Sequence, residues 1–155
     1  MLTNRYRIDN GNMATETNLN RFIEAQAGDY DQALAEIRNG RKRSHWMWYI
    51  FPQLSGLGYS SMAQLYGIDG VEEATDYLAH PLLGNRLITI ANALLRVEGK
   101  TATQIMGTPD DLKLRSSMTL FSAVQPTDPV FQAVLTKYFN GVPDQRTLTM
   151  LKNGY

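Results

Sequence analysis

Cysteine is absent from the sequence, and histidine occurs only as His45 and His80. Without thiols the chain has no disulfide framework, thiolate zinc site, iron–sulfur cluster or cysteine nucleophile. Two histidines are also too few for a multi-histidine metal site, so we expect neither a bound metal nor a cofactor. The lack of cysteine suits a reducing compartment, and we expect a cytoplasmic protein.

Net charge and long apolar runs are missing as well. The 15 Lys and Arg residues balance 15 Asp and Glu residues, which disfavours nucleic acid as a partner because contact with phosphate backbones depends on excess positive charge. No stretch of about 18 uncharged apolar residues occurs, so we expect no membrane-spanning helix and no membrane partner. The first residues also lack the apolar core of a signal peptide.

The sequence also lacks the alternation of apolar and polar residues that is typical of β-strands. Its apolar residues follow a helical period instead. Apolar residues recur at the i, i+3, i+4 and i+7 spacing of amphipathic helices. Pro81, Pro109 and Pro129 each stand where a proline opens a helix. We therefore predict an all-α protein with a single compact domain of six to eight short helices over residues 18–155. The polar residues 1–17 are predicted to form a mobile tail.

Capping residues set the expected helix boundaries. Asp29 is placed to cap a helix that Gly40 ends, and Thr108 is placed to cap the helix that begins at Pro109. The domain is long enough to bury one hydrophobic core without disulfides. We expect that core to contain nine apolar side chains, each on the apolar line of its own helix: Phe22, Leu34, Ile37, Leu87, Leu94, Met118, Phe121, Leu135 and Phe139.

One segment departs from the generic helical pattern. Residues 41–53 read Arg-Lys-Arg-Ser-His-Trp-Met-Trp-Tyr-Ile-Phe-Pro-Gln, so both tryptophans of the chain closely follow three cations. The aromatic side chains either fill the core or line a pocket. Aromatic faces beside cations suit a ligand with a flat base and phosphate groups. In the second case, the candidates for ligand binding are Lys42, Arg43, His45, Trp46, Trp48 and Gln53.

Residues 110–119 form the second unusual segment, because Ser116 and Ser117 fall within an expected helix, where serine is disfavoured. Lys113 and Ser117 are four positions apart and share a helix face. The segment is either a plain helix or the polar border of a pocket. In the second case, we expect residues 42–53 and the face of Lys113 and Ser117 to meet around one pocket.

Four stretches of the chain resemble domain-of-unknown-function family 1810. The most specific is residues 40–53, which contain His-Trp-Met-Trp, and the others are residues 22–26, 77–84 and 113–121. The resemblance covers about residues 19–152 and implies a small, mostly bacterial, all-helical domain without an established activity. Members are often labelled calpastatin, but calpastatin-type inhibitors are disordered and poor in aromatics, whereas this chain has the periodicity of a folded domain.

A fainter resemblance links the chain to the YbiA-like group of ADP-ribose-linked N-glycosidase domains. Those domains carry an aromatic–Gln-Ala helix, a tryptophan segment and a Lys…Met…Phe helix. Here Glu-Ala-Gln at residues 24–26, Trp46 and the Lys…Met…Phe pattern of residues 113–121 occur in comparable order. Their Trp-x-x-x-Glu-His signature is absent. The resemblance implies only a nucleotide-like or ribosyl ligand. Gln26 is a further ligand-binding candidate.

Two functions follow as hypotheses. The first is binding of a phosphate-bearing, nucleotide- or ADP-ribose-like small molecule. The protein either only binds this molecule or also hydrolyses it as an N-glycosidase does, with His45 or Glu36 transferring a proton. The alternative is a protein–protein interaction module that uses an aromatic and methionine surface. A polar-lined hollow around residues 45–53 favours the small ligand, and a flat aromatic patch favours the protein partner.

Overall fold

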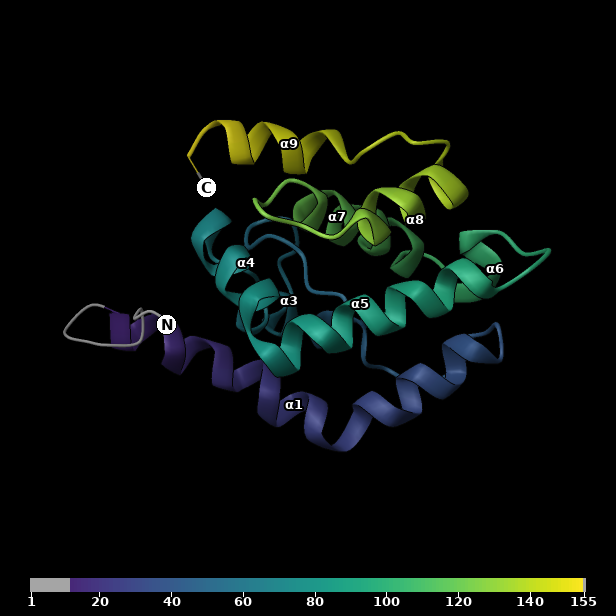
Figure 1. Ribbon diagram of the computed structural model, residues 1–155, viewed down its shortest axis with the longest axis horizontal. Helices are drawn as coiled ribbons and strands as arrows, with labels where there is room; N and C mark the ends of the chain where they lie inside the picture. The colour runs from purple at the N-terminus through teal and green to yellow at the C-terminus, as the bar shows by residue number, and fades with distance from the viewer. Residues whose placement is uncertain (1–11, 155) are drawn as a thin grey trace.

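The computed structural model describes residues 12–154, with side chains from residue 19 onward (Figure 1). Helices are the regular secondary structure throughout these residues, which confirms the predicted all-α class. Their number exceeds the expected six to eight because α2, α3 and α6 span four or five residues, too few to show a helical period. The nine helices of the described residues are α1 (Asn12–Arg38), α2 (Met47–Ile50), α3 (Ser61–Leu65), α4 (Gly70–Ala79), α5 (Pro81–Arg96), α6 (Ala102–Met106), α7 (Asp110–Ser122), α8 (Pro129–Phe139) and α9 (Gln145–Lys152).

The first helix, α1, is continuous where the sequence predicted a break. It begins at Asn12, inside the segment predicted as a tail, while residues 1–11 lie outside the described residues. Asp29 lies within α1 instead of capping a second helix, and its carboxylate accepts a hydrogen bond from the Tyr49 hydroxyl. Gly40 has a φ of +79° and turns the chain away after the helix ends, as predicted.

The starts of α5 and α8 follow the sequence, whereas the start of α7 does not. The His80 and Asp128 side chains accept hydrogen bonds from first-turn backbone N–H groups of α5 and α8, each before a proline at the first helical position. The prediction that Thr108 caps α7 was wrong. That helix begins at Asp110, Pro109 occupies the cap position without a side-chain hydrogen bond, and the Thr108 hydroxyl instead donates to the carboxylate of the second helical residue.

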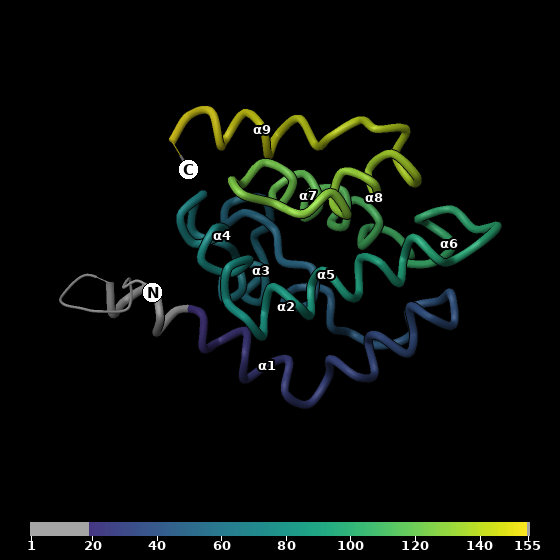
Figure 2. The backbone as a smooth tube through the Cα atoms, viewed as in Figure 1, coloured from purple at the N-terminus to yellow at the C-terminus, as the bar shows by residue number. Residues whose placement is uncertain are grey.

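The helices stack in layers around α5 (Figure 2). α1, α4 and α8 all contact α5, and α7 packs against α8. α9 contacts α7 and lies on the far side of the molecule from α1. Seven of the nine predicted core side chains are buried, whereas Leu34 and Phe139 are only partly buried and pack against the edge of the core.

The chain approaches itself closely at Gly84 of α5. A Cβ atom at this position would lie 2.0 Å from the carbonyl oxygen of Leu78 in α4, so only glycine fits between the two helices. Gly28, inside α1, is the opposite case, because a Cβ atom there would meet nothing within 4 Å. Helix packing therefore requires glycine at position 84, whereas position 28 has room for a side chain.

The loop between α2 and α4 is fixed at both ends. The Ser55 N–H donates to the Ile68 carbonyl at 2.8 Å, and the Ile68 N–H donates to the Gln53 carbonyl at 2.9 Å. Arg21 of α1 donates to the Leu65 and Gly67 carbonyls of this connection at 2.7 and 2.8 Å. It also pairs with both carboxylate oxygens of Glu73 in α4 at 3.0 Å each. These contacts hold Gln53 in a defined position beside α7, where the candidate site lies.

Candidate functional site

Glu36 organises the turn that carries the aromatic segment. Its carboxylate accepts hydrogen bonds from the backbone N–H groups of Arg43 (2.8 Å) and Ser44 (3.0 Å), from the Ser44 hydroxyl (2.6 Å) and from the Trp46 indole Nε1 (2.8 Å). Burial raises the pKa of Glu36, but these hydrogen bonds outweigh burial and lower the pKa from 4.5 to about 2. A carboxylate that is ionised and fully hydrogen-bonded holds the turn in place, so the geometry does not support the proton-transfer role considered for Glu36.

Trp46 belongs to the core rather than to a binding surface. It is 1% exposed, and the neighbouring Met47 and Phe51 are equally buried. Lys42 covers its ring, with Nζ 4.9 Å from the ring centroid. Of the two tryptophans named as ligand-binding candidates, Trp46 thus has no open indole face on which a ligand could stack.

Asp110 joins the same turn to α7. Its carboxylate forms an ion pair with Lys42 at 2.9 Å and lies 3.7 Å from Lys113 Nζ. Lys42 also donates to the Ser44 carbonyl, and its side chain is 8% exposed. Lys42 is thus engaged within the protein and closed to a phosphate, whereas Lys113 keeps 26% of its side chain exposed.

Lys113 and Trp48 meet at a narrow crevice between α2 and α7. Lys113 Nζ lies 5.3 Å from the centroid of the Trp48 ring, and Gln53 and Tyr66 contribute to the walls. The crevice has a volume of about 10 Å³, room for a single water molecule. It brings together the two segments that the sequence singled out, but it does not admit a nucleobase.

Two buried polar atoms in these segments lack a protein partner. The Trp48 indole Nε1 and the Ser117 hydroxyl are buried, and neither finds a hydrogen-bond partner among the described residues. Ser117 is 0% exposed and lies one helical turn beyond Lys113 on α7. Unpaired buried polar atoms are rare in proteins, and these two keep hydrogen-bonding capacity for a water molecule or a ligand atom.

A wider hollow of about 300 Å³ shares Gln53 and Lys113 with the crevice. Arg115 and Arg146 add two further cations to its walls. Asp144 contributes a carboxylate, which caps the first turn of α9 and keeps its negative charge there. Three cations against this one carboxylate leave the lining of the hollow with an excess of positive charge, on a chain whose formal net charge is zero.

Each arginine of the hollow uses only some of its donors on the protein. Arg115 Nε donates to the Val142 carbonyl at 2.9 Å, and Arg146 Nη2 reaches the Gly56 carbonyl at 3.4 Å. A guanidinium has five N–H donors, so donors on both side chains remain for an anion. Sequence reasoning missed these two arginines because each looks like an ordinary surface cation. The fold alone brings Arg146 to a loop 90 positions earlier in the chain.

The other candidates lie outside the hollow. Gln26 is buried and donates to the Tyr49 carbonyl at 2.8 Å and the Tyr77 hydroxyl at 2.9 Å, so it belongs to a polar network within the core. Arg43 and His45 are exposed and line neither the crevice nor the hollow.

Within residues 12–154 no group of three or more acidic or histidine side chains is arranged to hold a metal ion. Over the same residues, none of the helices combines the length and the apolar character needed to cross a membrane.

Sequence and structure are both similar to known proteins. A family model described as protein of unknown function (DUF1810) matches residues 16–151. The crystal structure of the conserved hypothetical protein Rv1873 from Mycobacterium tuberculosis aligns with a TM-score of 0.86 and 49% sequence identity, over 87% of this chain and 96% of that chain. No functionally curated protein matches. Because the family model covers most of the chain, the chain belongs to the DUF1810 family.

Proposed function

We propose that the protein binds a small, nucleotide-derived molecule bearing phosphate, in the hollow lined by Lys113, Arg115 and Arg146. The observation that carries the proposal is the grouping of these three cations around about 300 Å³ of space on a chain without net charge. Guanidinium and ammonium groups recognise phosphate through charge-assisted hydrogen bonds. The volume lies at the lower end of ordinary ligand pockets, which suits one nucleotide or sugar phosphate.

Gln53 supplies a contact that would separate a nucleotide from inorganic phosphate. It lies where the hollow meets the crevice, and its amide offers both donors and an acceptor to a base edge or a ribose. An ADP-ribose-like ligand, which the resemblance to the YbiA-like domains suggests, has partners for this amide.

The proposal is confined to binding. Glu36 is occupied by its hydrogen bonds, and His45 does not line the hollow, so neither candidate for proton transfer stands beside the proposed ligand. The alternative of a protein-interaction module depended on an exposed aromatic and methionine surface. Trp46, Met47 and Phe51 are buried, so these three side chains do not form such a surface.

Thermal-shift measurements with AMP, ADP-ribose, NAD and ribose 5-phosphate test the proposal. A ligand present at 100 times its Kd is expected to stabilise the protein by about 2.7 kcal/mol. Lys113→Gln and Arg146→Gln each remove one charge from the hollow. We expect each change to weaken binding about tenfold or more, because a hydrogen bond to a charged group contributes about 1.5–3 kcal/mol.

Lys152→Gln is the matched control. Lys152 lies on α9 like Arg146, is exposed and does not line the hollow. This variant is expected to bind as tightly as the unchanged protein. The proposal fails if none of the four molecules raises the melting temperature, or if the three variants bind alike.

A further inference from the structure

A separate cavity lies between the C-terminal ends of α1 and α5. Its volume is about 610 Å³. Four of its lining residues fall at positions i, i+3, i+4 and i+7 and therefore share one face of α5. The walls are formed by Arg38 of α1, by Thr89, Asn92, Ala93 and Arg96 of α5, and by Val97 after it.

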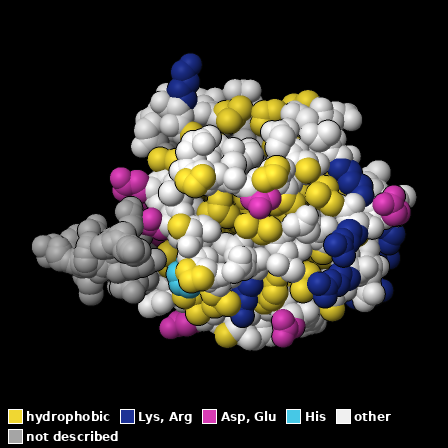
Figure 3. All heavy atoms as spheres, viewed as in Figure 1, with side chains coloured by type: hydrophobic (Ala, Val, Ile, Leu, Met, Phe, Trp, Pro, Cys, Tyr) yellow, Lys and Arg dark blue, Asp and Glu magenta, His cyan; other side chains and the backbone are white. Residues whose placement is uncertain are grey.

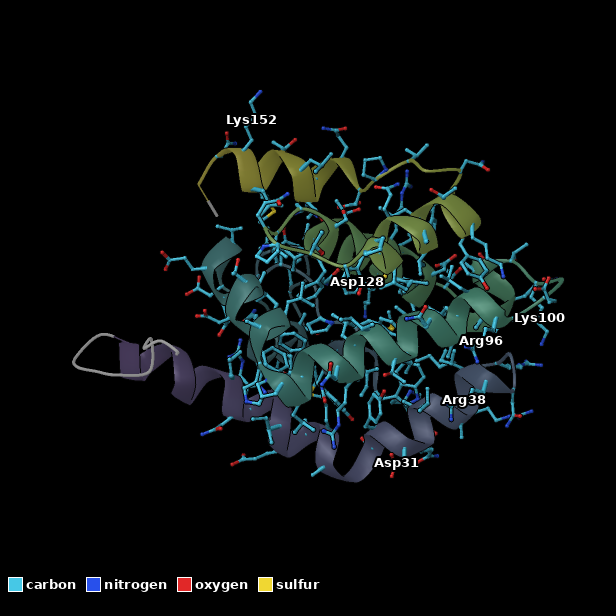
Figure 4. All side chains as sticks on the ribbon, viewed as in Figure 1. Asp31, Arg38, Arg96, Lys100, Asp128 and Lys152 are labelled. Carbon is cyan, nitrogen blue, oxygen red and sulfur yellow. The ribbon has the colours of Figure 1, made fainter. Side chains whose placement is uncertain are left out.

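The two arginines of this cavity carry charge that the protein leaves unneutralised. Both are exposed, and within the described residues neither Arg38 nor Arg96 forms an ion pair. Figure 3 shows Lys and Arg side chains gathered at this end of the molecule, and Figure 4 places Arg38, Arg96 and Lys100 there. Like charges that face one cavity repel each other, and an anion between them relieves the repulsion.

The segments that follow the two helices hold the cavity in shape. Lys100 Nζ donates to the Gly40 carbonyl at 3.0 Å, which ties the chain after α5 to the turn after α1. The backbone N–H of Lys42 donates to the Ile105 carbonyl at 2.7 Å, which ties the same turn to α6. The backbone around the cavity is therefore positioned before a ligand arrives, and binding needs to order only the two exposed arginine side chains.

We infer that this cavity binds an oligophosphate, a chain of at least two linked phosphate groups, with Arg38 and Arg96 on different phosphates. Guanidinium groups recognise phosphate oxygens in bidentate pairs, and two of them suit a ligand with two charged groups. No aromatic side chain is among the lining residues, so recognition is directed at phosphate and not at a base. The cavity shares no lining residue with the hollow around Lys113.

A cation near a helix C-terminus also stabilises its own helix, and Arg38 and Arg96 both occupy last turns. That effect operates equally at Lys152 in the last turn of α9, which Figure 4 shows at a distant corner of the molecule. Lys152→Gln therefore removes a helix-end cation without touching the cavity. This variant therefore distinguishes the loss of a stabilising cation at a helix end from the loss of a ligand contact in the cavity.

Isothermal titration calorimetry of the full chain with sodium tripolyphosphate, at fixed ionic strength, tests the inference. The unchanged protein is expected to bind one tripolyphosphate and to prefer it to orthophosphate. Arg38→Gln and Arg96→Gln are each expected to weaken this binding about tenfold or more. Lys152→Gln is expected to stay within about twofold of the unchanged protein. Both arginines are exposed, so circular dichroism is expected to show an intact fold in each variant.

Three results would overturn the inference. Equal affinity for orthophosphate and tripolyphosphate would show a general charge effect. Loss of binding in Lys113→Gln, with both arginine variants unaffected, would assign tripolyphosphate to the hollow and support the proposed function instead. Tighter binding of a single-stranded oligonucleotide through the same two arginines would assign the cavity to a nucleic-acid backbone.

Discussion

At the scale of single residues, Trp46 and Glu36 depend on each other. A buried indole N–H requires an acceptor, and the Glu36 carboxylate provides it at 2.8 Å. The same carboxylate receives three more hydrogen bonds from the turn at residues 43–44. Loss of this one side chain would leave four donors without their acceptor, which is more costly than loss of the hydrogen bonds alone.

We predict that Glu36→Gln lowers the free energy of unfolding at pH 7 by about 2–4 kcal/mol, because the amide is neutral and directs its own NH₂ group at donors. Urea unfolding followed by circular dichroism measures the change. Glu24→Gln is the matched control, since Glu24 is exposed on the same helix. A similar loss of stability in both variants would contradict the role assigned to Glu36.

The stability should also depend on pH through Glu36. Folding lowers its pKa from 4.5 to about 2, so its stabilisation is present above about pH 4.5 and is lost as the pH falls toward 2. The shift corresponds to about 3 kcal/mol. The free energy of unfolding of Glu36→Gln should therefore fall less steeply than that of the unchanged protein across this range. Parallel pH profiles would show that Glu36 is not the group that titrates.

The hydrogen bond between Trp46 and Glu36 could not be predicted from the sequence. A buried indole N–H needs an acceptor, but nothing in the spacing of residues named Glu36, whose carboxylate equally suited proton transfer. The reason is physical: a buried carboxylate and a catalytic one look identical until the turn at residues 40–46 folds over α1. Trp48 was a candidate because two tryptophans closely follow three cations, and Lys113 was a candidate because it shares a helix face with Ser117.

At the scale of helices, the contact between α4 and α5 depends on Gly84. We predict that Gly84→Ala destabilises the protein by about 3 kcal/mol or more, because the new Cβ would lie 2.0 Å from a backbone carbonyl oxygen of Leu78. Backbone atoms cannot rotate away as a side chain can, so α4 and α5 must separate. Thermal unfolding measures the loss.

Gly28→Ala is the matched control for this prediction. A Cβ atom at position 28 meets nothing within 4 Å, and the residue is exposed within α1. The substitution is expected to stabilise the protein by about 0.5–1 kcal/mol through higher helix propensity and a less flexible unfolded chain. Destabilisation by both substitutions would indicate that α1 bends or breaks at Gly28.

Helical periodicity predicted the long helices better than their ends. α5 and α8 begin where a cap residue and a proline coincide, and both signals act locally. The break predicted at Asp29 was wrong because Gly28 and Asp29 lower helix propensity only modestly, while α1 gains packing contacts with α2, α4 and α5. These contacts join helices that are far apart in the sequence, so a stretch of about a dozen residues does not reveal them.

At the scale of the whole molecule, the net charge is zero, but cations gather at two places, the hollow around Lys113 and the cavity between α1 and α5. The hollow assembles Gln53, Lys113, Arg115 and Arg146 from three separate regions of the chain. The cavity between α1 and α5 brings Arg38 and Arg96 together in the same way. The fold class was predictable because helical period is local, whereas both sites arise from helix packing that the sequence does not display.

The central position of α5 has a consequence for how the domain opens. Seven of its residues are buried, and it contacts α1, α4 and α8, whereas α9 buries only Thr147. Backbone amide protons of α5 should exchange with deuterium only when the whole domain unfolds, while those of α9 should exchange through local fraying. Mass spectrometry of deuterium uptake is therefore expected to find the slowest peptides within residues 83–94 and fast ones within residues 145–152. Uptake in α5 as early as in α9 would mean that the helices separate individually, without a common cooperative transition.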